Sequence, residues 1–100
     1  MTVQEAIKRV AQLDPYTTRD FSHGTHRVSP SGQVMIDYRI ERGILPCPVC
    51  GQWTGMGMIT VRHIDGRSVV FSPALYHYVD AGHPLSDIDG DLLIAIMRDA

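Results

Sequence analysis

The feature that most constrains this chain is a pair of cysteines in the stretch CPVCG, which runs from Cys47 to Gly51. They are the only two cysteines in the sequence. Two thiols at this spacing, followed by glycine, are typical of a zinc knuckle, a tight turn in which backbone amides point at sulfur. Glycine tolerates the positive φ angle of such a turn. A redox-active pair would instead begin a helix, and the following GQWTGMGM is poor helix-forming sequence. The pair therefore predicts half of a zinc site.

Tetrahedral zinc needs two further ligands, and five histidines compete for these positions: His23, His26, His63, His77 and His83. We favour His77 and His83. Six positions along an unbroken helix rotate a side chain by about 600°, which would turn His83 away from His77. Gly82 resolves this, because a left-handed glycine ends the helix and lets His83 fold back. Asp80 lies three positions after His77 and is expected to accept a hydrogen bond from its ring as an outer partner of the metal.

Three other histidines remain as alternative ligands. His63 shares a strand face with Ile59 and Val61, so it points inward, where a histidine is more often a hydrogen-bonded core residue. His23 and His26 have an unusual spacing for zinc and lie in a segment expected to be a loop.

The chain has 100 residues, which suits a single domain over 1–100. Residues 1–14 predict an amphipathic N-terminal helix with Thr2 and Glu5 as a capping box. Residues 15–33 are polar and rich in turn residues, which predicts a loop.

Residues 34–83 predict a β-rich zinc module. Alternation over 34–40 indicates a half-buried strand, and Asp65-Gly66 between two β-branched runs indicates a hairpin. Ser72 and Pro73 then start a helix that Gly82 ends.

The order of knuckle, hairpin and helix resembles that of zinc-ribbon and treble-clef modules over residues 45–83. The resemblance rests on CPVCG and HYVDAGH. It implies an α+β fold, in which a small zinc-stabilised, treble-clef or ββα-like unit is flanked by an N-terminal and a C-terminal helix. The 26 residues between Cys50 and His77 exceed the dozen or so of a C2H2 finger.

A second, fainter resemblance concerns the stretch RHIDG and the helix that follows it. It is similar to the ββα-metal (HNH-type) nucleases, which implies His63 as general base and His77 as metal ligand. The helix asparagine and the second cysteine pair of that family are missing from this chain.

Two cysteines and two histidines fill the four positions of zinc, so the predicted site is structural and not catalytic. The net charge of −2 gives no global basic field for nucleic acid. Nucleic-acid binding stays an alternative through a local set of arginines: Arg39, Arg42, Arg62 and Arg67.

Residues 84–100 predict a C-terminal helix in which six consecutive residues are apolar. A helix apolar around most of its circumference must be covered on more than one side. We therefore expect it to meet a partner protein, in the simplest case a second copy in a homodimer. The expected interface residues are Leu92, Leu93, Ile94, Ile96 and Met97.

The favoured function is a small zinc-binding protein that acts as a regulator, adaptor or inhibitor of a larger assembly through protein–protein contacts. The chain has no run of about 20 apolar residues that could span a membrane. Its first ten residues mix charges and contain no signal-peptide core. We therefore expect a cytoplasmic protein.

Overall fold

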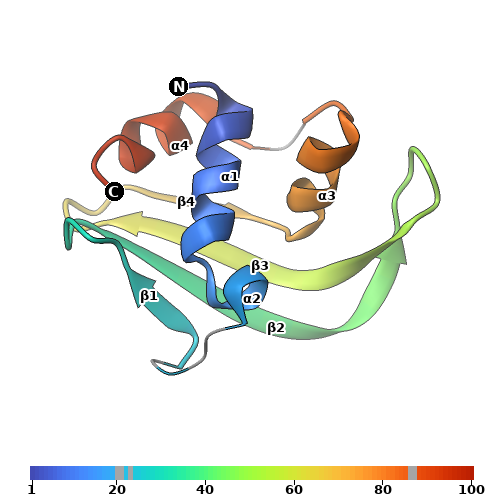
Figure 1. Ribbon diagram of the computed structural model, residues 1–100, viewed down its shortest axis with the longest axis horizontal. Helices are drawn as coiled ribbons and strands as arrows, with labels where there is room; N and C mark the ends of the chain where they lie inside the picture. Colours follow the sequence, from blue (N-terminus) through green and yellow to red (C-terminus); the bar gives the residue numbers. More distant parts are fainter. Residues whose placement is uncertain (20–21, 23, 86–87) are drawn as a thin grey trace.

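The structure is a computed structural model that describes residues 1–19, 22, 24–85 and 88–100, without the side chains of residues 16 and 40–44. Within these residues, three helices, α1, α3 and α4, lie on one face of a four-stranded antiparallel sheet (Figure 1). The elements are α1 (Val3–Leu13), α2 (Pro15–Thr18), β1 (His26–Val28), β2 (Val34–Pro46), β3 (Trp53–His63), β4 (Ser68–Phe71), α3 (Ala74–Ala81) and α4 (Gly90–Met97). The predicted α+β class is confirmed, whereas the treble-clef interpretation stays a prediction.

Helix α1 begins at the predicted capping box. The Thr2 hydroxyl accepts a hydrogen bond from the Glu5 backbone N–H at 3.1 Å, and its oxygen lies 3.2 Å from the Glu5 carboxylate. The apolar stripe of the helix, Ala6, Ile7 and Val10, is fully buried against the sheet. The sequence therefore determines both where this helix starts and which side it buries.

The prediction of a loop over residues 15–33 is wrong in two places, α2 and β1. Helix α2 is a single turn that starts at Pro15 and closes with a hydrogen bond from Thr18 N–H to Asp14 O at 3.0 Å. Strand β1 has three residues, and its central residue Arg27 pairs with Ile36 of β2. Elements this short have too few residues to show a hydrophobic period.

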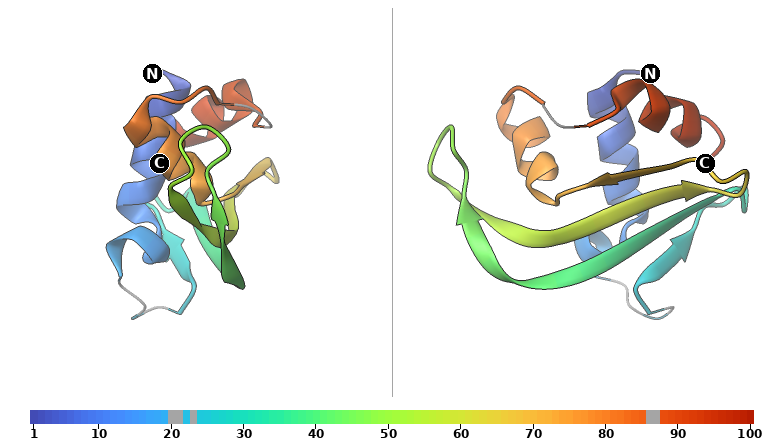
Figure 2. Two further views of the ribbon diagram at one scale, coloured as in Figure 1. Left: turned by 90° about the vertical axis from the view of Figure 1, so that its right-hand side faces the viewer. Right: turned by 180° about the vertical axis from the view of Figure 1, so that it is seen from behind.

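The sheet has the order β1-β2-β3-β4, and its long central hairpin, β2–β3, reaches well beyond its neighbours. The pairing runs from Val34 opposite His63 to Pro46 opposite Trp53, with an irregularity between Ile40 and Ile44. The hairpin bends toward the helices, and its tip lies beside α3 (Figures 1 and 2). β1 and β4 pair only with the half nearest Val34 and His63. The other half is a two-stranded ribbon.

The β3–β4 turn forms at Asp65-Gly66, as predicted. The His63 N–H donates to Arg67 O at 2.8 Å, and the Arg67 side chain contacts the Asp65 carboxylate at 2.7 Å. His63 is buried, its Nδ1 accepts from the Asp65 N–H, and its Nε2 lies 2.8 Å from the Asp99 carboxylate. This turn is thereby joined to the residues that follow α4.

Helix α3 has the predicted Ser72 and Gly82 at its ends, whereas α4 is shorter than the predicted span of residues 84–100. The Ser72 hydroxyl accepts from the Ala74 N–H at 3.2 Å, and Gly82 ends α3 with a φ angle of +71°. Asp89 caps α4 by accepting from the Leu92 N–H at 3.1 Å.

Helix α4 packs inside the chain's own core. Leu93, Ile96 and Met97 are fully buried, and Leu92 and Ile94 are partly buried against the same core. The helix lies on α1, β3 and β4. Leu93, Ile96 and Met97 are therefore not available to the interface expected on α4, and the homodimer stays a prediction without this support. Among the described residues, no helix has the length and apolarity needed to span a bilayer.

Replacing Ile96 with alanine should lower the free energy of unfolding by about 2–5 kcal/mol, because it leaves a cavity in the core. Ile64 is 75% exposed, so Ile64→Ala is a matched control with an expected change within about 0.5 kcal/mol. Urea unfolding of both variants measures the difference. An Ile96→Ala cost that varies with protein concentration would instead place this residue in an interface between copies.

Asp65 should make stability depend on acid pH. The backbone N–H of Arg67 donates to its carboxylate and lowers the pKa, which burial only partly opposes. A carboxylate whose pKa is lower in the folded state stabilises the fold at every pH above its pKa in the unfolded chain, which is about 3.9. This stabilisation is lost as the pH falls through the pKa of the folded state. The stability difference between the wild type and Asp65→Asn should therefore shrink as pH falls from about 5 to below 3. A difference independent of pH would contradict this.

Candidate metal centre

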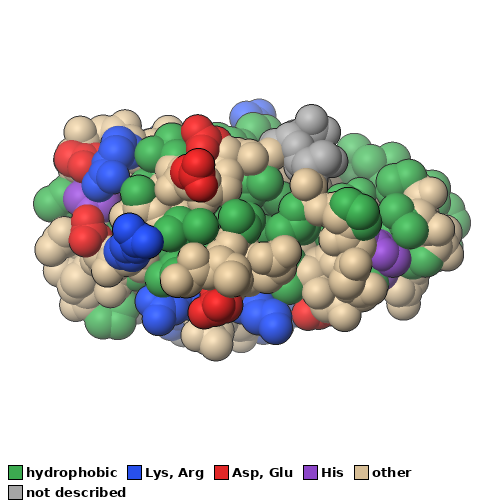
Figure 3. Space-filling model, turned by 90° about the horizontal axis from the view of Figure 1, so that it is seen from above, with side chains coloured by type: hydrophobic (Ala, Val, Ile, Leu, Met, Phe, Trp, Pro, Cys, Tyr) green, Lys and Arg blue, Asp and Glu red, His purple; other side chains and the backbone are tan. Residues whose placement is uncertain are grey.

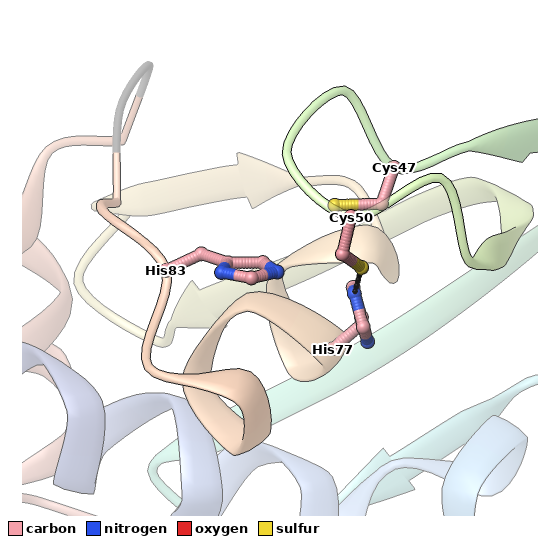
Figure 4. Close-up of side chains that lie close together, drawn as sticks. All are labelled: Cys47, Cys50, His77 and His83. Atoms are coloured by element: carbon pink, nitrogen blue, oxygen red, sulfur yellow. Dashed lines mark hydrogen bonds between the residues drawn. The ribbon is translucent and has the colours of Figure 1, made fainter.

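Four side chains from separate parts of the chain converge beside the hairpin tip: Cys47, Cys50, His77 and His83 (Figure 4). Each offers one donor atom, and these atoms all lie within 4.8 Å of one another. The cysteines come from the turn between β2 and β3, His77 from α3, and His83 from the segment just after α3. The structure therefore brings together all four residues that the sequence predicts as ligands.

The turn around the cysteines has the hydrogen bonds of a compact loop. The Cys47 N–H donates to Gln52 O at 2.7 Å, and the Gly51 N–H donates to Cys47 O at 2.8 Å. Gly51 has a φ angle of +73°, a value that favours glycine over any other residue. Cys47 is buried, whereas Cys50 is exposed.

The Cys47 sulfur lies in surroundings that favour a thiolate. Burial raises the pKa of this thiol, but the backbone N–H groups of Cys50 and Val49 and the Cys50 side chain act together to hold the pKa below its ordinary value. Amides directed at sulfur stabilise negative charge. Because the thiolate is the metal-binding form of cysteine, the turn prepares Cys47 to be a ligand.

Gly82 places the two histidines side by side. Its left-handed conformation ends α3, and the next residue folds back so that the His83 N–H donates to Tyr78 O at 2.8 Å. The rings of His77 and His83 then lie 5.3 Å apart, centre to centre. His77 Nε2 is 3.3 Å from the Cys50 sulfur. This is the chain reversal that the H-x5-H spacing requires.

His83 has an unmet need for a partner. Its Nε2 atom is buried, and among the described residues it has no hydrogen-bond partner. A buried polar atom left in this state costs about 1–3 kcal/mol. The ring points toward the two cysteines and His77 (Figure 4), so a metal ion bound there would satisfy this nitrogen.

The donor atoms fit a tetrahedral ion. Bonds of about 2.3 Å to sulfur and 2.0–2.1 Å to nitrogen place neighbouring donors about 3.3–3.8 Å apart. The Cys50–His77 pair is already at 3.3 Å, and the widest separation is below 4.8 Å, so small side-chain rotations would close the set. Thiolate and imidazole suit zinc and similar transition metals, whereas Mg²⁺ and Ca²⁺ prefer oxygen. The cluster could therefore bind a metal ion of the former kind.

Asp80 was predicted to accept a hydrogen bond from His77, but it does not contact the cluster. It is exposed, and among the described residues no hydrogen bond joins it to His77. It lines a small cavity between α3 and α1 together with Ile7 and Lys8. The reason is rotational, since the His77 ring turns to the hairpin tip while Asp80, three residues on, faces α1.

The alternative histidine ligands lie elsewhere. His63 is at the opposite end of β3, where both ring nitrogens contact aspartates. His26 is exposed and contacts Asp37 at 3.0 Å, and His23 lies outside the described residues. Because His63 and His77 do not meet, the geometry of a ββα-metal nuclease is not formed.

The four arginines proposed for nucleic acid do not all point freely into solvent. Arg67 contacts Asp65 at 2.7 Å and Asp99 at 3.8 Å. Arg39 and Arg62 are exposed on the face of the sheet away from the helices, and the side chain of Arg42 is outside the description. This weakens the case for a basic surface.

Comparison with known protein families, with curated proteins and with solved structures finds no match for this chain. The assignment of the site therefore rests on the geometry of the four side chains.

Three exposed apolar residues that were not predicted lie beside the site: Leu45, Val49 and Trp53, with exposed fractions of 54%, 62% and 65%. The available signal was the stretch from Gly43 to Val61, which contains no Asp, Glu, Lys or Arg.

The purified chain should contain one tightly bound metal ion, and His83→Ala should reduce its affinity. We expect a loss greater than the 10–100-fold typical of removing an outer partner, because a ligand itself is lost. His26→Ala, which alters an exposed histidine outside the cluster, is the matched control. Elemental analysis measures the metal content of each variant, and competition with a chelator measures its metal affinity. Equal metal affinity in the two variants would show that His83 is not a ligand.

Proposed function

We propose that this chain is a small zinc-binding protein in which one structural zinc ion supports a surface for binding another protein. The observation that carries the proposal is the convergence of two sulfur and two nitrogen donors, one of them a buried nitrogen without a partner. Cys47, Cys50, His77 and His83 would hold the ion.

The donor set supports zinc as the metal and a structural role for it. Sites with two cysteines and two histidines are a common form of structural zinc site. A catalytic zinc ion keeps one position for water and has a general base nearby. Here four protein donors would fill the coordination sphere, which leaves the ion no position for a substrate.

The metal would stabilise the part of the sheet that has least support. Beyond the ends of β1 and β4, no further strand among the described residues pairs with the β2–β3 hairpin, and a two-stranded hairpin is marginally stable in water. A zinc ion would join its tip to α3 through His77 and His83. The free energy of metal binding would in this way stabilise the position of the tip.

The supported tip has the character of an interaction surface. Leu45, Val49 and Trp53 are each more than half exposed there. The end of the molecule that holds the tip shows no Asp, Glu, Lys or Arg side chains in Figure 3. Large aromatic residues and a lack of charge distinguish the centres of protein interfaces. A regulator, adaptor or inhibitor of a larger assembly would use such a surface.

Removing the metal should loosen the tip and leave the core folded. We expect faster amide hydrogen exchange in residues 45–58 after treatment with a chelator, because the link to α3 is lost. Residues of α1 should keep their protection, since they pack in the core. Adding Zn²⁺ should restore the slow exchange, and adding Mg²⁺ should not. Unchanged exchange after complete metal removal would show that the metal does not support the tip.

A further inference from the structure

The two cysteines of the metal centre lie within reach of each other. The Cys50 side chain hydrogen-bonds to the Cys47 sulfur, and all four donor atoms of the centre lie within 4.8 Å of one another. The Gly51 N–H donates to Cys47 O, which makes this segment a single α-turn, and residues three apart in such a turn are neighbours. The turn therefore holds the two sulfurs where side-chain rotation could join them.

The two cysteines differ in their access to solvent. Cys47 has an exposed fraction of 2%, whereas Cys50 is exposed. Both are free thiols, and they are the only cysteines in the chain, so each has the other as its one partner for a disulfide within the molecule. A reagent that arrives from solvent would meet Cys50 first and find Cys47 directly behind it.

A bound zinc ion would keep the exposed sulfur reactive. Cysteine binds a metal as the thiolate, and the thiolate is also the nucleophile that oxidants attack. Cysteines that sense oxidants are typically exposed thiolates beside a second cysteine. The pair is followed by β3 and not by the helix that catalytic redox pairs begin. It would therefore respond to an oxidant without catalysing repeated turnover.

We infer that this cysteine pair is a redox switch, in which a peroxide joins Cys47 and Cys50 in a disulfide, releases the zinc ion and frees the hairpin tip from α3. The inference rests on the proposed function, since it gives the zinc-supported surface a means of regulation.

The reaction balances with hydrogen peroxide as the oxidant. The Cys50 thiolate attacks one peroxide oxygen, the O–O bond breaks, and the products are a sulfenic acid and a hydroxide that takes up a proton to become water. The Cys47 thiolate then attacks the Cys50 sulfur, and the S–S bond forms as the S–O bond breaks. The departing hydroxide takes up a proton to become a second water. Sulfur gives two electrons to oxygen, and zinc leaves as Zn²⁺.

The disulfide would remove half of the ligand set. Neither sulfur would then be a thiolate, the form of cysteine that binds metal. His77 and His83 would remain, and two imidazoles fall short of the four ligands of a structural zinc site. A thiol reductant would reverse the change by exchange with the disulfide. The tip would therefore be fixed under reducing conditions and loosened under oxidising ones.

The experiment treats the full zinc-loaded chain with hydrogen peroxide in metal-free buffer. A colorimetric zinc indicator follows release of the ion, and mass spectrometry of the denatured chain identifies the oxidised residues. We expect one disulfide between Cys47 and Cys50 for each zinc ion released. Amide hydrogen exchange should become faster in residues 45–58 and stay slow in α1. Adding a thiol reductant together with Zn²⁺ should restore the starting state.

Cys50→His keeps four possible zinc ligands and removes the exposed thiolate. Because the remaining sulfur of Cys47 is enclosed, peroxide should release zinc from this variant at least about tenfold more slowly than from the wild type. Met58→Leu is the matched control. Met58 is 39% exposed and can itself be oxidised, so this variant removes a competing target, and its rate of zinc release should equal that of the wild type.

Several results would overturn the inference: zinc that stays bound in peroxide, zinc release without the disulfide, a disulfide between two chains, or equally fast release from Cys50→His. Zinc content before oxidation is measured separately. A zinc-loaded chain that keeps its zinc in peroxide contradicts this inference alone, whereas a purified chain that binds no zinc contradicts the proposed function.

Discussion

Four donor atoms lie where the turn between β2 and β3 meets the end of α3, and in the function proposed above a metal ion bound by them would fix the position of the hairpin tip. On one side, the Cys47 turn directs amides at sulfur. On the other, Gly82 folds His83 back beside His77. The buried core is formed by α1, α4, β4, Leu75 of α3 and the parts of β2 and β3 nearest Val34 and His63. Apolar packing therefore holds one half of the domain, and the four donors lie at the tip of the other half.

The parts that the sequence predicts well are those determined by local chemistry. The capping box at Thr2, the turn at Asp65-Gly66 and the left-handed Gly82 each act within a few residues, and each is found as expected. The convergence of Cys47, Cys50, His77 and His83 was predictable for the same reason. Two cysteines at fixed spacing and a glycine before His83 restrict the geometry, so few arrangements of the remaining donors fit zinc.

The parts that it predicts poorly depend on contacts distant in the chain. Strand β1 is held by pairing with β2 and has only three residues, too few to show alternation. The distal half of β2–β3 is rich in glycine and proline and lies beyond the alternation seen over 34–40, yet pairing continues to Pro46 and Trp53. Apolarity all round α4 shows that it is covered, but the sequence cannot tell whether the cover is α1 and the sheet or another molecule. The predicted contact between Asp80 and His77 is also missing, because the direction in which Asp80 points depends on how α3 is rotated against its neighbours.

The two cysteines differ in exposure, and this difference bears on how fast a bound ion would exchange. Cys47 is enclosed, with an exposed fraction of 2%, whereas Cys50 faces solvent. An incoming thiol or chelator can reach the ion only on the side of an accessible donor, so exchange would begin by displacement of Cys50. A site of this kind can hold its metal tightly at equilibrium and still transfer it rapidly to a competing ligand. In such a site all four donors would contribute to the affinity, whereas the exposed Cys50 would govern how fast the ion exchanges.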